Sequence, residues 1–197
     1  MPATLDADGT HWNPNKDTKM KIDLGCGGKK KAGFIGLDQY PMQGVDHVLN
    51  IGHERWPFED ASVEEAYSSN FLEHLTNLNG AWERVHFFNE LDRVLRPGAK
   101  AFVAIPHWNS ERFYGDPTHK EPFSEMGVYY LNKDWRLSQA PHTDRTWNPH
   151  GYSCNFDASL GYVLQPELRH LTGKEKEHAQ RWLRASVQEM HLHLTKR

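Results

Sequence analysis

The sequence predicts an α/β fold built on a mostly parallel sheet, on the basis of three observations. Short apolar segments alternate with helical or looping segments from residue 20 onwards. Residues 81–95 repeat apolar side chains at spacings of three and four, as an amphipathic helix does. Residues 101–105 are continuously apolar and end at Pro106, which is typical of a parallel strand covered on both faces.

The first third of the chain contains four short strand candidates. Residues 21–24 form the first of them and end in the turn Gly25-Cys26-Gly27-Gly28. The connections between the first three strands are at or below the dozen residues that a parallel crossover normally takes, so we expect abbreviated helices there. The other three strand candidates are residues 34–38, 45–50 and 63–69.

The rest of the chain alternates one helix, strands and a long irregular block. Pro97-Gly98 is expected to stop the helix at 81–95 before the next strand begins. Residues 107–150 are rich in Trp, His, Pro, Asn and Asp and have little periodicity, which is typical of a lid or an acceptor-binding insertion. The remaining expected elements are a helix within 124–131, a strand at 155–164, a helix at 174–185 and a strand at 186–195.

Length and charge limit the possible classes of protein. The 197 residues suit a single domain at residues 19–197 after a flexible polar tail at residues 1–18. The 23 Lys and Arg residues nearly balance the 26 Asp and Glu residues, so a net charge of −3 gives no strong signal for nucleic acid or membrane partners. No apolar stretch approaches the length of a spanning helix and residues 1–19 lack an apolar leader, which predicts a cytoplasmic protein.

Metal and thiol chemistry find little support in the sequence pattern. Two cysteines, Cys26 and Cys154, are too few for a disulfide framework, a four-thiolate zinc site or a three-cysteine radical cluster. The 13 histidines show neither H-E-x-x-H nor C-x-x-C spacing, so we expect no metal. Cys26 is interpreted as a small residue in a tight loop.

The turn after the first strand and the acid after the second describe a nucleoside site. Small residues at Gly25, Cys26 and Gly27 let the backbone approach a ligand closely, and Asp38 can accept hydrogen bonds from both hydroxyls of a ribose. The dinucleotide fingerprint G-x-G-x-x-G would need a glycine where the chain has Lys30, and no phosphate-binding P-loop motif occurs. The pattern therefore disfavours NAD and FAD.

Over residues 20–106 the chain resembles the class I S-adenosylmethionine-dependent methyltransferases. Residues 23–27 match the first motif of the family, D-x-G-C-G. Later segments are similar to L-P-F-x-D-x-S-F-D (residues 56–63), to L-E-H-L after strand four (residues 70–75) and to E-x-x-R-V-L-K-P-G-G before strand five (residues 90–99). Residues 115–120 and 193–197 look similar to small phage-encoded methyltransferases of this fold.

The resemblance implies a Rossmann-like sheet of seven strands, mostly parallel with an antiparallel last strand, and S-adenosyl-L-methionine as cofactor. Asp38 would bind its ribose, and a side chain added at Gly25 would fill space that the methionine end needs. The chain has Asn50 where many relatives carry an acid. The residues implied for the methionine end are Asp23, Gly25, Cys26, Gly27 and Asn70, and those implied for the adenine are Asn50 and Ile51.

Methyl transfer from a sulfonium is an in-line displacement, so the protein mainly aligns the nucleophile, the methyl carbon and the sulfur. A base is needed only where the nucleophile must lose a proton. The candidates near the carboxyl ends of strands four and five are His119, His74, His107 and Asp116. We choose His119, because an unperturbed histidine pKa near 6.5 suits a base at neutral pH. Glu73-His74 is interpreted equally well as a structural start to the helical region or as a substrate-side pair.

The sequence motifs exclude some classes of methyl acceptor without identifying one. DNA amino-methyltransferases carry D/N-P-P-Y where this chain reads Ser69-Asn70-Phe71-Leu72, and neither cysteine follows a proline as pyrimidine C5 chemistry requires. The remaining reaction is O- or N-methylation of a small molecule, a modified nucleoside, a glycan or a protein. The alternatives are a cofactor-binding protein of the same fold without transferase activity, and a nucleotide-using enzyme of another class.

Overall fold

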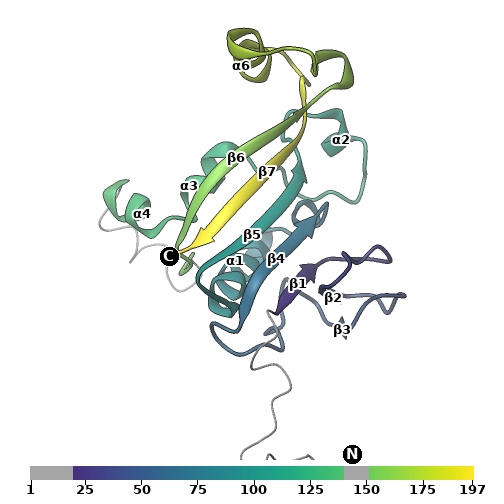
Figure 1. Cartoon of the computed structure of the whole chain (residues 1–197), viewed down its shortest axis with the longest axis vertical. Helices are drawn as coiled ribbons and strands as arrows, with labels where there is room; N and C mark the ends of the chain where they lie inside the picture. Colours follow the sequence, from purple (N-terminus) through teal and green to yellow (C-terminus); the bar gives the residue numbers. More distant parts are fainter. Residues whose placement is uncertain (1–19, 140–150) are drawn as a thin grey trace, which may run out of the picture.

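The computed structural model describes residues 20–139 and 151–197, which include a seven-stranded sheet of order β3-β2-β1-β4-β5-β7-β6 (Figure 1). The tail expected at residues 1–18 lies outside the described residues. The strands are β1 (Lys21–Leu24), β2 (Ile35–Asp38), β3 (His47–Val48), β4 (Val63–Ser69), β5 (Leu95–Pro106), β6 (Phe156–Leu164) and β7 (Val187–Lys196). The helices are η1 (Leu72–His74), η2 (Leu78–Gly80), α1 (Glu83–Val94), α2 (Glu111–Tyr114), α3 (Glu125–Tyr129), α4 (Lys133–Gln139), η3 (Pro166–Leu168) and α6 (Gly173–Trp182).

The strand directions confirm the predicted mostly parallel sheet. β1 pairs in parallel with β2 and β4, and the pairs β2–β3 and β4–β5 are parallel as well. β7, the last strand in the chain, is antiparallel to both of its neighbours, β5 and β6. The chain order changes direction between β1 and β4, and open α/β sheets bind ligands beside the carboxyl ends of strands at such a point.

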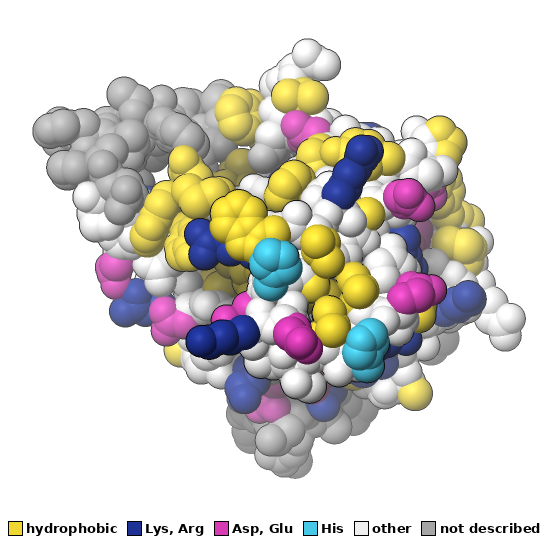
Figure 2. Space-filling view, turned by 90° about the horizontal axis from the view of Figure 1, so that it is seen from above, with side chains coloured by type: hydrophobic (Ala, Val, Ile, Leu, Met, Phe, Trp, Pro, Cys, Tyr) yellow, Lys and Arg dark blue, Asp and Glu magenta, His cyan; other side chains and the backbone are white. Residues whose placement is uncertain are grey.

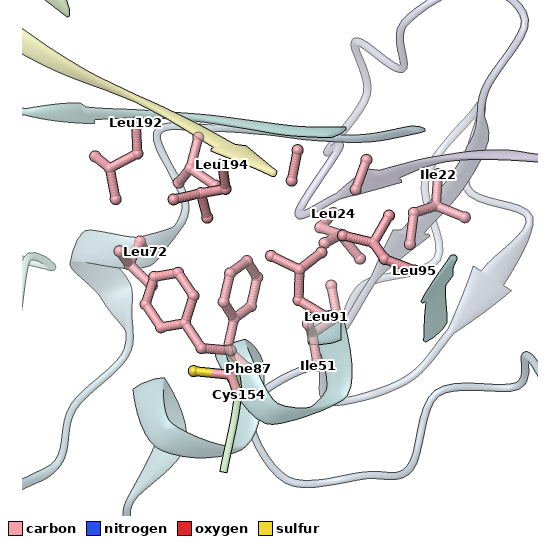
Figure 3. Close-up of a cluster of buried hydrophobic side chains, with 14 of the residues drawn as sticks. Ile22, Leu24, Ile51, Leu72, Phe87, Leu91, Leu95, Cys154, Leu192 and Leu194 are labelled. Carbon is pink, nitrogen blue, oxygen red and sulfur yellow. The ribbon is translucent and has the colours of Figure 1, made fainter. Parts of the chain in front are cut away.

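One face of the sheet packs against α1, as the apolar spacing of residues 81–95 predicts. Phe87, Phe88 and Leu91 of α1 are fully buried against apolar side chains from β1, β5 and β7 (Figure 3). Burying a Leu or Phe side chain stabilises the fold by about 1.5–3 kcal/mol, so this layer supplies much of the hydrophobic free energy. The sheet residues in the same cluster are Ile22, Leu24, Leu37, Val63, Ala66, Leu95, Ala101, Val103, Ile105, Phe156, Met190, Leu192 and Leu194.

The opposite face of the sheet carries a row of rings. Tyr67 on β4 stacks on Phe102 on β5 with ring centroids 5.5 Å apart, and Phe102 meets His191 and His193 on β7 edge-on at 5.0 and 5.2 Å. The ammonium nitrogen of Lys31 lies 4.4 Å from the Tyr67 ring centroid, a cation–π distance. No helix of the described residues lies over this face (Figure 1). The side chains of the row therefore remain partly exposed to solvent.

The short connections at the start of the chain explain the missing layer. Residues 25–34, between β1 and β2, and residues 39–46, between β2 and β3, are all described and contain no helix. The prediction of abbreviated early helices is therefore confirmed. β3 is shorter than the strand expected at residues 45–50, because only His47–Val48 pairs with β2.

The helix expected at residues 81–95 ends within one residue of its predicted end, but the strand expected at residues 101–105 begins earlier, before Pro97-Gly98. α1 ends at Val94, and the chain enters β5 at the next residue. Leu95 pairs with Val63, and pairing resumes at Lys100 and Glu65, so residues 96–99 stand opposite the single Glu64. The proline and glycine thus lie in a bulge of β5, where a missing N–H and the positive φ of Gly98 (80°) are tolerated.

The last elements follow the sequence pattern closely, whereas the described part of the long block contains two helices that were not predicted, α2 and α4. The helix expected within 124–131 is α3, and the helix expected at 174–185 is α6. The strands expected at 155–164 and 186–195 are β6 and β7. β6 and β7 extend past the other strands and carry α6 beyond the end of the sheet (Figure 1). Within the two described ranges, no helix combines the length and the apolar character needed to cross a bilayer.

Candidate functional site

The glycine loop after β1 is fixed against the end of β2. Gly25 and Gly27 have positive φ angles of 69° and 51°, which glycine adopts without strain. The N–H of Gly25 donates to the Leu37 carbonyl at 2.9 Å, and the N–H of Gly27 donates to Asp38 Oδ2 at 2.9 Å. These bonds hold the loop beside the carboxylate, as a nucleoside site requires.

Asp38 keeps acceptor capacity after these bonds. Its Oδ1 accepts the Tyr40 N–H at 3.0 Å, so each oxygen accepts one hydrogen bond from the described residues, while an ionised carboxylate offers about four acceptor positions. The side chain is 8% exposed, at the loop of Gly27. The geometry therefore fits the ribose contact that the sequence implies.

Asp23 and Cys26 serve the loop itself. The carboxylate of Asp23 is 3% exposed, and its Oδ2 accepts the Lys31 N–H at 2.7 Å, tying down the far end of the loop. Burial raises the pKa of Asp23 from its ordinary value despite this bond. The Cys26 thiol is buried where it would lie 2.8 Å from a Cβ added at Gly36 on β2, and burial raises its pKa to about 11, which keeps it protonated.

The space beside Gly25 is filled by protein. A Cβ built on Gly25 would lie 2.2 Å from the Phe71 ring, far inside contact distance. The Phe71 ring in turn lies 6.1 Å from the ring of Phe87 on α1. The sequence interpretation that a side chain at Gly25 would occupy cofactor space is therefore corrected, because it would first displace Phe71.

The three remaining cofactor candidates occupy two loops. Asn70 directly follows β4 with a positive φ of 52° and an exposed side chain. Asn50 is exposed, and its Oδ1 accepts the Gly52 N–H at 3.1 Å. Ile51 is only 1% exposed and lies within the hydrophobic core, so it offers a ligand very little accessible surface.

Two of the candidate bases lie together beside an acid that sequence reasoning did not choose. The rings of His74 and His119 meet edge-on with centroids 4.9 Å apart. Nε2 of His119 lies 3.9 Å from Glu73 Oε1 and 3.7 Å from Asp116 Oδ2. We name Glu73, His74 and His119 the Glu-His-His cluster. Only the L-E-H-L motif hinted at Glu73, because His119 is distant in the chain.

Glu73 is buried without a hydrogen-bond partner among the described residues. It is 3% exposed, and neither carboxylate oxygen accepts a hydrogen bond. The nearby Arg84 donates instead to the carbonyls of Leu72, Glu121 and Pro122. Burial raises the pKa of Glu73 to about 7.

His107 and Asp116 have different surroundings. His107 is 4% exposed, and its Nε2 lies 3.0 Å from Glu125 Oε1, so the structure ties it to α3 and not to the cluster. Asp116 is exposed, and hydrogen bonds from the side chain and the N–H of Thr118 lower its pKa. Asp116 therefore remains ionised beside His119.

Two motif segments form a structural clamp. Glu90 Oε2 accepts the Trp56 N–H at 2.7 Å, and Arg93 donates to both carboxylate oxygens of Glu90. The same guanidinium donates to the carbonyls of Trp56 and Phe58 at 3.0 and 2.7 Å. The residues that resemble E-x-x-R thus fasten the turn before β4 onto α1.

Residues of the segment after β5 line two cavities. One, of about 330 Å³, lies between α2 and the residues before β7, with Ser110, Tyr114 and Arg184 in its wall. The other, of about 320 Å³, lies beside α3, with Arg84 and Tyr152 in its wall. Figure 2 looks onto the end of the molecule that β4 and β5 point towards in Figure 1, where hydrophobic side chains gather among His and charged residues.

Comparisons with known proteins agree with this geometry. A family model described as a methyltransferase domain matches residues 37–103. The chain is similar to the structure of a SAM-dependent methyltransferase from Archaeoglobus fulgidus, at 18% identity over 92% of this chain and 87% of that one, with a TM-score of 0.61. No curated protein matches the sequence.

Two further solved structures share the fold at lower similarity. A SAM-dependent methyltransferase from Methanosarcina mazei is 17% identical over 90% of this chain and 92% of that one, with a TM-score of 0.50. Geranyl diphosphate C-methyltransferase from Streptomyces coelicolor A3(2), solved with Mg²⁺, geranyl diphosphate and S-adenosyl-L-homocysteine, is 15% identical over 91% of this chain and 73% of that one, with a TM-score of 0.50. Residues 37–103 thus match a methyltransferase domain, and the chain as a whole shares the fold of these methyltransferases.

Proposed function

We propose that the protein transfers the methyl group of S-adenosyl-L-methionine to an oxygen or nitrogen atom of its acceptor. The observation that carries this proposal is the Asp38 carboxylate bonded to the glycine loop at the end of β2, beside the point where the sheet order changes direction. A sulfonium is already an activated leaving group, so the reaction needs alignment more than covalent catalysis.

The cofactor would lie across the carboxyl ends of β1 and β2. Asp38 would accept hydrogen bonds from the ribose hydroxyls, and the backbone of Gly25, Cys26 and Gly27 would face the methionine end. Asn70 would reach the same end from β4, and the chain at Asn50 and Ile51 would flank the adenine. Because Ile51 is buried, it would offer the adenine very little accessible surface.

His119 is the candidate base where the nucleophile must lose a proton. Its Nδ1 lies 2.7 Å from the Phe113 carbonyl, which can only accept, so Nδ1 carries the hydrogen and Nε2 keeps a lone pair. Asp116 lies 3.7 Å from Nε2 and would stabilise the imidazolium that proton transfer produces. The His74 ring lies next to the His119 ring, whereas His107 would act indirectly, by holding Glu125 at the start of α3.

The acceptor would enter from the segment after β5, proposed as an acceptor-binding insertion at residues 107–150. Of its aromatic side chains, Trp108 is partly exposed, Tyr114 is largely exposed, and Phe113 is buried against His119. Residues 140–150 of this block lie outside the described residues.

The function is tested with methyl-labelled S-adenosylmethionine and a panel of phenols, amines, nucleosides, glycans and peptides. We expect label to enter one class at an O or N atom, with S-adenosylhomocysteine as the second product. Tight binding of S-adenosylhomocysteine with no labelled product from any class would instead favour the alternative of a cofactor-binding protein of this fold. Label on carbon would contradict the proposed acceptor atom.

Asp38→Ala should weaken S-adenosylhomocysteine binding by about ten- to a hundredfold. Hydrogen bonds to a charged group contribute about 1.5–3 kcal/mol, which corresponds to that change in Kd. Calorimetry on the wild type and the variant measures it, with Asp157→Ala, an exposed change on β6, as control. An unchanged Kd in Asp38→Ala would remove the ribose assignment.

His119→Ala should lower the rate of methyl transfer by about 10²–10⁴ while the Kd for S-adenosylhomocysteine changes less than about twofold. This range is typical of losing a general base. The rate is measured with the acceptor found in the screen, and His178→Ala, exposed on α6, is the control. Transfer at the wild-type rate would show that the acceptor needs no base at this position.

A further inference from the structure

We propose that the Glu-His-His cluster is a binding site for one divalent transition-metal ion. Glu73, His74 and His119 each offer one ligand atom, and these atoms all lie within 4.8 Å of one another. Two imidazole nitrogens and one carboxylate oxygen are a ligand set that suits Zn²⁺ and related first-row ions. The inference does not rest on the proposed acceptor chemistry.

The first support is the unsatisfied carboxylate. Both oxygens of Glu73 are buried without a hydrogen bond from the described residues, and Oε1 faces Nε2 of His119 at 3.9 Å. An unpaired buried carboxylate is costly, whereas a cation between the two groups would satisfy it. The available guanidinium of Arg84 is already used on three carbonyls.

The second support is how the ligands are held. Metal-binding histidines commonly donate their other ring N–H to a carbonyl, which orients the ring, and Nδ1 of His119 makes this bond to Phe113 at 2.7 Å. Nδ1 of His74 lies 3.3 Å from the Thr118 carbonyl. The N–H of Lys120 donates to the Glu73 carbonyl at 2.9 Å, so both segments that supply ligands are joined by backbone.

The distances need only small movements to close around an ion. Bonds of about 2.0–2.2 Å in a tetrahedral site place ligand atoms about 3.3–3.5 Å apart. The Glu73–His119 pair is within about 0.5 Å of that separation, and the ligand atom of His74 lies within 4.8 Å of the other two. The exposed side of His74 would leave a fourth position for water or another ligand.

The ion and the proton-accepting role of His119 compete for one lone pair. Nε2 of His119 cannot hold the ion and accept a proton from an acceptor at the same time. Occupancy of the site would therefore decide whether His119 is available as a base. Binding is measurable without cofactor or acceptor, so the metal site can be tested apart from methyl transfer.

The test uses the full chain without a polyhistidine tag, stripped with a chelator and titrated with Zn²⁺ against a chromophoric competitor. We expect one equivalent to bind, and Glu73→Gln and His119→Ala to weaken binding at least tenfold. His178→Ala, an exposed histidine on α6, should leave the affinity unchanged. Co²⁺ should give the intense visible absorption of a low-symmetry four- or five-coordinate site in the wild type and lose it in Glu73→Gln.

Equal Zn²⁺ affinity in the wild type, Glu73→Gln and His119→Ala would overturn the inference, as would the weak spectrum of hexa-aqua Co²⁺ in the wild type. Circular dichroism checks that each variant folds. If His119→Ala does not fold, Glu73→Gln, which keeps the shape of the side chain, and the Co²⁺ spectrum of the wild type decide the result. Zn²⁺ binding without S-adenosylhomocysteine binding would refute the proposed function alone, and the reverse result would refute the metal site alone.

Discussion

Arg93→Ala lowers the free energy of unfolding by about 3–5 kcal/mol, because it leaves Glu90 as a buried charge without its main partner. The side chains of Arg93 and Glu90 are only 14% and 11% exposed, so water replaces little of the lost interaction. Burial alone would raise the pKa of Glu90, but the bonds from Arg93 and the Trp56 N–H outweigh it and lower the pKa. The carbonyls of Trp56 and Phe58 lose a donor in the same variant.

Urea denaturation followed by circular dichroism measures this loss. Arg55→Ala is the matched control, since Arg55 pairs with Asp60 where both side chains are about 70% exposed, and such pairs contribute about 0–1 kcal/mol. Arg93→Lys should fall between the two, because an ammonium cannot make the forked bond to a carboxylate. A loss below about 1 kcal/mol in Arg93→Ala would contradict the clamp.

Gly25→Val should abolish S-adenosylhomocysteine binding and also destabilise the fold by about 3 kcal/mol or more. A β-branched residue at a φ of 69° is strained by about 1–3 kcal/mol. The new Cβ would in addition force the Phe71 ring from its place beside Phe87, and overpacking of this kind costs about 1–3 kcal/mol. Thermal unfolding and calorimetry are measured on the same preparations.

Two further variants separate backbone strain from collision. Gly28→Ala should change neither stability nor binding, since nothing lies within 4 Å of the added Cβ and its φ is not positive. Adding Phe71→Ala to Gly25→Ala should recover part of the stability lost in Gly25→Ala alone, because the smaller side chain vacates the space. Normal stability in Gly25→Val would restore the simpler interpretation that only cofactor space is filled.

The strands were predictable because their signal is local. The predicted bounds of β1 and β4, residues 21–24 and 63–69, are the same as those in the structure, because apolar side chains and turn residues mark both ends of each strand. The start of β5 was not predictable from Pro97-Gly98, because pairing of Leu95 with Val63 starts the strand before the proline. Strand pairing is a long-range interaction and outweighs the local stop signal.

The candidate site was predictable to the extent that it lies in contiguous motifs. The glycine loop and Asp38 follow adjacent strands, so their meeting follows from a parallel sheet. The closeness of His119 to Glu73 depends on how residues 107–120 fold back, and no spacing rule contains that information. Likewise, nothing adjacent to Gly25 in the sequence indicates that Phe71 fills the space beside it.

The missing helical layer at the β3 edge of the sheet has a consequence for how the stability of the protein depends on the concentration of its cofactor. Strands β1 to β3 at that edge are short and lack a second helical layer among the described residues, so their amide protons should exchange through openings well below global unfolding. Cofactor bound to the loop between β1 and β2 would close those openings, adding about 2.7 kcal/mol at a hundredfold excess over Kd. The lifetime of the folded edge, and with it resistance to proteolysis, would then rise and fall with the concentration of S-adenosylmethionine.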